Sequence, residues 1–126
     1  MKTLVAVYGT LRTGYGNNRH CLNNSKSMGY GYVPYMRMYS YGGFPVCCRT
    51  DNLADQVVVE VFDTPDTDLA KCDRLEGHPT FYERQEVTVL MEDGTTLQAQ
   101  MYLQPKERCG HLDLIESGDW KQRYVM

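Results

Sequence analysis

The sequence lacks the features that mark several common functional classes. It has no excess of basic residues, because its net charge is -3 at pH 7 and its isoelectric point is near 5.5. The general electrostatic attraction that drives most binding to nucleic acids and anionic membranes is therefore missing. No apolar run approaches the length that a bilayer needs, and no small-residue cleavage site follows the first apolar stretch. We expect a cytoplasmic protein with no nucleic-acid or membrane partner.

Cysteine and histidine patterns typical of metal or redox sites are also missing. The five cysteines form no C-x-x-C motif and lie mostly inside apolar patterns: Cys21, Cys47, Cys48, Cys72 and Cys109. Free cysteine behaves as a small buried hydrophobic residue, so we expect reduced, packed thiols rather than a disulfide framework. The histidines form no cluster with cysteine or aspartate of the kind that holds zinc, and we predict no metal site.

Nucleotide-binding and serine-hydrolase motifs are absent as well. The segment LVAVYGTLRTGYGNN, residues 4–18, does place a glycine-rich loop directly after an apolar run. However, its glycines neither lead into G-K-[ST] nor match the dinucleotide-binding fingerprint. The backbone N–H groups of such a loop can still bind a smaller anion, such as a carboxylate. No serine lies in a G-x-S-x-G setting.

The patterns that are present predict one small α+β domain over residues 1–126. The apolar fraction of 42% and the charged fraction of 23% are those of a globular protein. Strand patterns dominate: TLVAVY, YGYVPYMRMY, FPVCC, QVVVEVF, and a hairpin of ERQEVTVLM and TTLQAQMYL joined at Asp93-Gly94. We predict a small, mainly antiparallel, closed or half-closed sheet with short helices, the weaker of them around residues 17–25 and 111–124.

One helix is well defined and carries a carboxylate on its apolar face. In TPDTDLAKCDRLEG, Thr64 can cap the helix and Gly77 can end it. Leu69, Cys72 and Glu76 follow i, i+3, i+7 spacing and so share one stripe. Burial and the negative end of the helix dipole both raise the pKa of a carboxyl group at that place, which suits general acid/base catalysis. The alternative is that Glu76 turns to solvent as an ordinary helix-end residue.

Tyrosines supply further candidates. In HPTFYER, strand alternation puts Tyr82 and Arg84 on one face, where they can hydrogen-bond a polar substrate; ordinary packing and solvent exposure are the alternative. In TTLQAQMYL, Tyr102 faces away from the apolar residues of its strand. We interpret the tyrosines of residues 30–41 as part of an amphipathic strand rather than a base-stacking surface, because only Arg37 is interleaved with them.

Taken together, these segments resemble the γ-glutamylcyclotransferase-like family, in particular its small branch that includes γ-glutamylamine cyclotransferase. The resemblance rests on VYGTLRTGYGN, GGFPV, VEVFDTPDTDLAKCDRLEGHPTFYER, the tyrosine of QMYL, and ESGDW, which keep the family order over nearly the whole chain. It implies a mixed β-barrel with flanking helices. It also implies a reaction that cyclises a γ-glutamyl amine or γ-glutamyl amino acid to 5-oxoproline and releases the amine.

The resemblance, carried over position by position, assigns roles to individual residues. Glu76 matches the catalytic carboxylate. The remaining matches are to the substrate loop, Tyr8, Gly9, Thr10 and Leu11, and to tyrosines of the pocket wall, Tyr82 and Tyr102. The implied partner is a small-molecule γ-glutamyl substrate, and the implied chemistry needs no cofactor.

One position departs from the family pattern. The family usually has glycine before the glutamate of the strand motif GEV, whereas Val59 stands there in this chain. A narrower pocket and a differently packed strand are the two consequences that stay open. The sequence therefore also allows a catalytically inactive member that uses the same pocket as a small-molecule binding or interaction scaffold.

Overall fold

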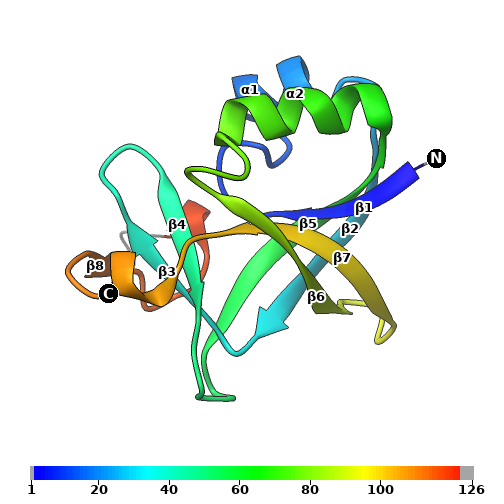
Figure 1. The fold of residues 1–126 in the computed structure, drawn as a ribbon. Helices are drawn as coiled ribbons and strands as arrows, with labels where there is room; N and C mark the ends of the chain where they lie inside the picture. Colours follow the sequence, from blue (N-terminus) through cyan, green and yellow to red (C-terminus); the bar gives the residue numbers. More distant parts are fainter. Residues whose placement is uncertain (1, 123–126) are drawn as a thin grey trace.

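The computed structural model describes residues 2–122 and has a closed β-barrel at its centre (Figure 1). The barrel order is β1 (Lys2–Val7), β5 (Gln56–Pro65), β2 (Lys26–Pro34), β6 (Glu83–Met91) and β7 (Thr96–Leu103). Neighbouring strands are antiparallel, except that β1 and β7 are parallel and complete the closure. The predicted α+β class with a small mixed, mainly antiparallel barrel is confirmed.

A second sheet lies beside the barrel and was not expected as a separate unit (Figure 1). It has the order β4 (Pro45–Arg49), β3 (Met36–Ser40), β8 (Asp113–Leu114). The predicted strand YGYVPYMRMY is split between the two sheets at Tyr35, whose φ of +59° is rare for a residue with a side chain. The helix predicted around 111–124 is wrong over the described residues, which form β8 and the 3₁₀ turn η2 (Trp120–Gln122) instead.

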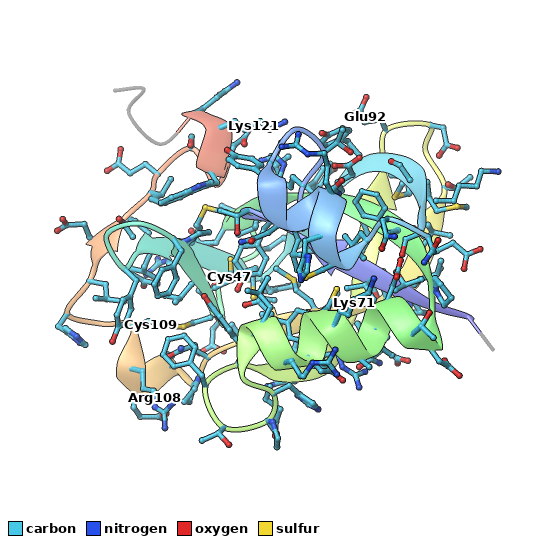
Figure 2. All side chains as sticks on the ribbon, turned by 90° about the horizontal axis from the view of Figure 1, so that it is seen from above. Cys47, Lys71, Glu92, Arg108, Cys109 and Lys121 are labelled. Atoms are coloured by element: carbon cyan, nitrogen blue, oxygen red, sulfur yellow. A yellow bond between two sulfur atoms is a disulfide. The ribbon has the colours of Figure 1, made fainter. Side chains whose placement is uncertain are left out.

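Two helices cover one side of the barrel: α1 (Gly16–Cys21) and α2 (Asp66–Glu76) (Figures 1 and 2). Lys71 Nζ on α2 donates a hydrogen bond of 2.7 Å to Oδ1 of Asn23, two residues after the end of α1. Thr64 does not cap α2, because β5 continues through Pro65 and the buried Thr64 hydroxyl donates to the Phe62 carbonyl. As predicted, α2 ends at Gly77, whose φ is +65°. No described helix is long and apolar enough to span a bilayer.

The strands bury two apolar clusters because their side chains alternate between the two faces of the sheet. One cluster fills the barrel and includes Val57, Val59 and Val61 of β5. The other lies between the barrel and the helices, where Phe62 of β5 meets Cys72 of α2. Tyr102 belongs to this second cluster, whereas its neighbours Met101 and Leu103 belong to the first. Its predicted orientation, away from the apolar residues of β7, is therefore confirmed.

The expectation of reduced thiols is wrong for one pair of cysteines. Cys48 in β4 and Cys109 (labelled in Figure 2) form a disulfide across 61 residues of sequence. The chain after β7 returns to β4, where the Gln104 N–H donates to the Cys47 carbonyl at 3.0 Å, and η1 (Lys106–Arg108) then brings Cys109 to Cys48. The other three cysteines are buried free thiols, as predicted: Cys21, Cys47 and Cys72.

Candidate active site

A pocket of about 210 Å³ opens where the loop after β1 meets the end of α2 and the start of β4. Each residue to which the family resemblance assigned a role lines this pocket: Tyr8, Gly9, Thr10, Leu11, Glu76, Tyr82 and Tyr102. They converge because β7 runs beside β1, which brings Tyr102 near Tyr8, while α2 crosses over both strands. The sequence did not single out Asn17, Phe44, Leu75 or Phe81, which also line the pocket.

Glu76 is the final residue of α2 and presents its carboxyl group to the pocket. Cys72, one turn earlier, is fully buried, and Leu69 packs against the second cluster, so the predicted stripe is present. Within residues 2–122 no hydrogen bond reaches the Glu76 carboxylate, and burial raises its pKa to about 7. A carboxyl group with this pKa can both accept and return a proton near neutral pH.

The loop after β1 offers hydrogen-bond donors to the same pocket. It turns sharply at Gly9, whose carbonyl accepts from the Arg12 N–H at 3.1 Å. The backbone N–H groups of Gly9, Thr10 and Leu11 donate to no acceptor in the described part of the chain. Adjacent N–H groups of this kind are suited to bind a carboxylate or a developing oxyanion.

Asn17, the second residue of α1, supports this loop. Its amide nitrogen donates to the Thr10 hydroxyl at 2.8 Å, and its side chain lines the pocket. Because no described donor reaches its amide oxygen, that oxygen can accept a hydrogen bond from a bound ammonium group. The signal for Asn17 in the sequence is only its place at the start of a helix directly after the loop.

Three tyrosines form the floor, and their hydroxyl groups already donate to protein acceptors. Tyr8 donates to the Tyr102 carbonyl at 2.6 Å, and Tyr82 donates to the Pro45 carbonyl at 2.7 Å. Tyr102 donates to Asp73 Oδ1 at 2.7 Å. Burial raises the pKa of all three hydroxyl groups, so they stay neutral at physiological pH. They shape the pocket and can accept hydrogen bonds, but their protons are already engaged.

The prediction that Arg84 hydrogen-bonds a substrate is not met by the geometry. Arg84 lies opposite Tyr102 in the β6–β7 register, but its guanidinium pairs with Asp73, with 2.7 Å between Nε and Oδ1. It does not line the pocket. Asp73 is one turn before Glu76 on α2, a tertiary contact that the strand pattern of HPTFYER could not reveal. Arg84 therefore fixes α2 to the barrel.

Two buried charges hold the loop after β1 in place. The Glu60 carboxylate, on β5, accepts hydrogen bonds from Thr13 and Ser27. Burial alone would raise the pKa of Glu60, but these hydrogen bonds and one from Tyr30 outweigh it, and the pKa is lowered. On the other side of the loop, Arg12 pairs with Asp119 at 2.6 Å. Both anchors lie outside the pocket.

Val59 packs inside the barrel, fully buried and opposite Gly31 in the β2–β5 register. It does not line the pocket. Of the two consequences considered for this departure from the family pattern, the structure favours a difference in strand packing. Within residues 2–122, no group of three or more histidine, cysteine, aspartate or glutamate side chains is placed to hold a metal ion.

The barrel and its pocket define a small mixed-barrel protein with a site of small-molecule size, and comparisons with known proteins identify the family. The family model described as "Gamma-glutamyl cyclotransferase, AIG2-like" matches residues 5–122, and the chain belongs to this family.

Individual relatives agree with this assignment. "Putative gamma-glutamylcyclotransferase MJ1514" of Methanocaldococcus jannaschii is 35% identical over 117 residues, which is 93% of this chain and 94% of the relative. The crystal structure of YkqA from Bacillus subtilis superposes with a TM-score of 0.78 at 26% identity, over 97% of this chain and 40% of that one. A solved gamma-glutamyl cyclotransferase shares the fold, with a TM-score of 0.68 at 17% identity over 90% of this chain and 70% of that one.

Proposed function

We propose that the protein is a γ-glutamylcyclotransferase-type enzyme, which converts a γ-glutamyl amine or γ-glutamyl amino acid to 5-oxoproline and the free amine. One observation carries the proposal: Glu76, with a pKa raised by burial to about 7, shares a pocket with the unpaired N–H groups of Gly9, Thr10 and Leu11. These are the proton carrier and the anion-binding donors that the reaction needs. Membership of the family supports the same reading.

The chemistry is intramolecular. The α-amino nitrogen of the substrate attacks its own γ-carbonyl carbon, a five-membered ring closes, and the bond from that carbon to the amine nitrogen breaks. Because both reacting groups belong to one molecule, much of the entropic cost of bringing them together is already met. The protein has three tasks: to take a proton from the α-ammonium group, to stabilise the oxyanion, and to protonate the leaving nitrogen.

Glu76 is proposed for both proton transfers. The α-ammonium nitrogen loses one proton before attack and a second after the ring has closed, and the departing nitrogen gains both and leaves as an ammonium group. Glu76 is proposed to relay them one at a time, so its own protonation state is restored after one cycle. General acid/base catalysis of this kind contributes a factor of roughly 100 to 10,000 in rate. The loop N–H groups are proposed for the substrate's α-carboxylate and the oxyanion, where one well-placed donor is worth about 3 kcal/mol. The Asn17 amide oxygen can orient the α-ammonium group.

The test is 5-oxoproline release from a panel of γ-glutamyl amines and γ-glutamyl amino acids. We compare the wild type with Glu76→Gln and with a matched control, Glu92→Gln, which changes an exposed carboxylate in the β6–β7 turn (Figure 2). Glu76→Gln should bind substrate but lose at least ~100-fold in kcat. Glu92→Gln should behave as the wild type.

Either of two results would contradict the proposal. Full activity of Glu76→Gln would exclude Glu76 as the proton carrier. If the folded wild type released no 5-oxoproline from any substrate of the panel, the activity would be excluded and the pocket would remain as a small-molecule binding scaffold.

A further inference from the structure

The pocket changes character from its floor to its mouth. Tyr82 and Tyr102 at the floor are 5% and 3% exposed, whereas Phe44 and Leu75, which line the same pocket, are 36% and 45% exposed. Phe81 lies between these extremes and also lines the pocket. The part of a ligand that projects toward solvent therefore passes two exposed apolar side chains.

The mouth is also organised before any ligand binds. The Tyr41 and Phe44 rings stack at a centroid distance of 5.1 Å, and the Phe81 ring contacts both edge-on, at 5.9 and 6.1 Å. The β3–β4 hairpin, which carries the first two rings, is closed by a hydrogen bond of 2.9 Å from the Tyr41 N–H to the Phe44 carbonyl. Aromatic groups in these stacked and edge-on arrangements hold one another in place. We call Tyr41, Phe44, Leu75 and Phe81 the apolar mouth.

The pocket has no cation for a carboxylate on the amine side of a substrate. None of the described residues that line the pocket is lysine or arginine. The lining residue whose pKa lies near neutral pH is an acid, Glu76. Arg12, which pairs with Asp119, and Arg84, which pairs with Asp73, lie outside the pocket as well. A carboxylate held against the apolar mouth would lose hydration without gaining a cationic partner among the residues that line the pocket, which disfavours binding.

The chemistry also fixes which end of the substrate reaches the mouth. The charged glutamyl end matches the unpaired donors of Gly9, Thr10 and Leu11 and the Asn17 amide oxygen. Glu76 must reach both the α-amino nitrogen and the amide nitrogen, so the scissile bond lies beside it. Leu75 directly precedes Glu76 and is exposed at the mouth. The substituent on the amide nitrogen consequently points along Leu75 toward Phe44 and Phe81.

From these observations we infer that the preferred amine carries an aromatic or branched apolar substituent and no carboxylate, and that the apolar mouth selects it. The inference rests on the proposed cyclotransferase function and narrows its substrate class from γ-glutamyl amines and amino acids to apolar γ-glutamyl amines. The bond from the ring nitrogen to the γ-carbonyl carbon forms and the amide carbon–nitrogen bond breaks. The α-ammonium nitrogen loses two protons through Glu76, and the departing amine takes up both and leaves as an ammonium group.

The test compares substrates that differ in one group. γ-Glutamylphenethylamide and γ-glutamylphenylalanine differ only by the carboxylate on the amine side, and γ-glutamylethylamide lacks the ring. The wild type should show kcat/KM for the phenethylamide at least about tenfold above the phenylalanine substrate, because the carboxylate has no partner at the mouth. It should also exceed the ethylamide by about tenfold through apolar contact with the ring.

Variants of the mouth give a second readout. Phe44→Ala should lower kcat/KM for the phenethylamide by about tenfold while changing the ethylamide much less. Leu75→Arg places a cation at an exposed position and should shift the preference toward γ-glutamylphenylalanine by about tenfold. Tyr32→Ala is the control, since Tyr32 is 38% exposed, as Phe44 is at 36%, but lies on β2 and does not line the pocket. It should leave the preference unchanged.

The outcomes separate this inference from the function on which it rests. Cyclisation of γ-glutamylphenylalanine as fast as the phenethylamide would overturn the inference and leave the cyclotransferase activity in place. If the folded protein cyclises no substrate, the proposed function fails, and calorimetric binding of the same substrate pair then decides whether the mouth selects the uncharged member. Equal binding of the pair would overturn the inference in that case too.

Discussion

Thr13 donates two hydrogen bonds to the buried carboxylate of Glu60, one from its backbone N–H at 2.8 Å and one from its hydroxyl at 2.6 Å. Thr13 follows the residues that line the pocket, and Glu60 belongs to a barrel strand. The pair therefore connects the loop to β5, a barrel strand that is paired on both sides, with β1 and with β2. The Glu60 carboxylate does not line the pocket, but it holds the loop whose backbone N–H groups do.

Thr13→Val should raise KM for γ-glutamyl substrates, because it removes the hydroxyl bond that holds the loop while keeping the side-chain shape. The loss of a hydrogen bond to a charged group should also lower the free energy of unfolding by about 1.5 kcal/mol. Ser27→Ala is the matched control: Ser27 donates to the same carboxylate at 2.8 Å, but from β2. It should destabilise the protein to a similar extent and leave KM unchanged. Equal changes in KM would contradict a loop-positioning role.

Activity should rise with pH as Glu76 ionises. The α-ammonium group can give its proton only to the carboxylate form of Glu76, and burial raises the pKa of this group to about 7. On the acidic limb of the profile, we expect kcat/KM to increase as pH rises through 7 and to reach a plateau above it. A profile measured from pH 5 to 8 with constant ionic strength tests this, and a flat profile over that range would contradict the assignment.

The same residue should make the protein less stable as pH rises. The raised pKa means that, between pH 4.5 and about 7, the unfolded chain releases a proton that the folded protein keeps. The stabilising contribution of the protonated form is complete below pH 4.5 and is lost as pH rises through about 7. Urea unfolding should show that Glu76→Gln gains on the order of 3 kcal/mol over the wild type across this range. A constant difference would place the Glu76 pKa near its ordinary value.

Gly9→Ala should disturb the pocket wall. A Cβ atom at Gly9 would lie 2.8 Å from Pro45 Cγ and 3.0 Å from Cδ, and the proline ring cannot move aside without its strand. Overpacking of this kind costs roughly 1–3 kcal/mol of stability, and we expect activity to fall with it. Gly16→Ala is the control in the same segment, since nothing lies within 4 Å of a Cβ atom there. Thermal melts and kcat/KM of both variants provide the comparison.

Two ion pairs with equal distances should differ in their effect on stability. Arg12–Asp119 and Arg37–Asp55 both have 2.6 Å between nitrogen and oxygen, but the side chains of the first pair are 4% and 15% exposed and those of the second are 40% and 22%. Asp119→Asn leaves a buried charge without its partner and should cost about 3 kcal/mol. Asp55→Asn should cost about 1 kcal/mol or less. Similar losses in chemical unfolding would contradict burial as the deciding factor.

Much of the fold could be predicted because its signals are local. The alternation in β7 gave the orientation of Tyr102, and Asp93-Gly94 gave the hairpin turn. The stop of α2 at Gly77 and the stripe that ends at Glu76 also follow from short-range patterns. These features together placed the carboxylate and one wall of the pocket.

The remaining features depend on contacts between distant segments. The tyrosine-rich strand divides at Tyr35 because the chain leaves the barrel there and enters the second sheet. Strand propensity predicts that both parts are extended, but not that they belong to different sheets. The Cys48–Cys109 pair and the Arg84–Asp73 contact require knowledge of which segments meet. From the sequence, Glu60 is indistinguishable from an ordinary polar residue of a strand. Its role in holding the loop after β1 becomes visible only when the structure places Thr13 beside it.

The apolar mouth is carried by segments outside the barrel, and this separates two kinds of change that the chain can undergo. The tip of the β3–β4 hairpin, residues 41–44, is a four-residue turn held by one backbone hydrogen bond, and Phe81 lies in the connection between α2 and β6. Leu75 shares α2 with Glu76, whereas the other three residues of the apolar mouth lie on neither α2 nor the anchored loop after β1. Under the proposed function, substitutions in these turns would change which amine is selected while leaving the proposed proton carrier and backbone donors in place.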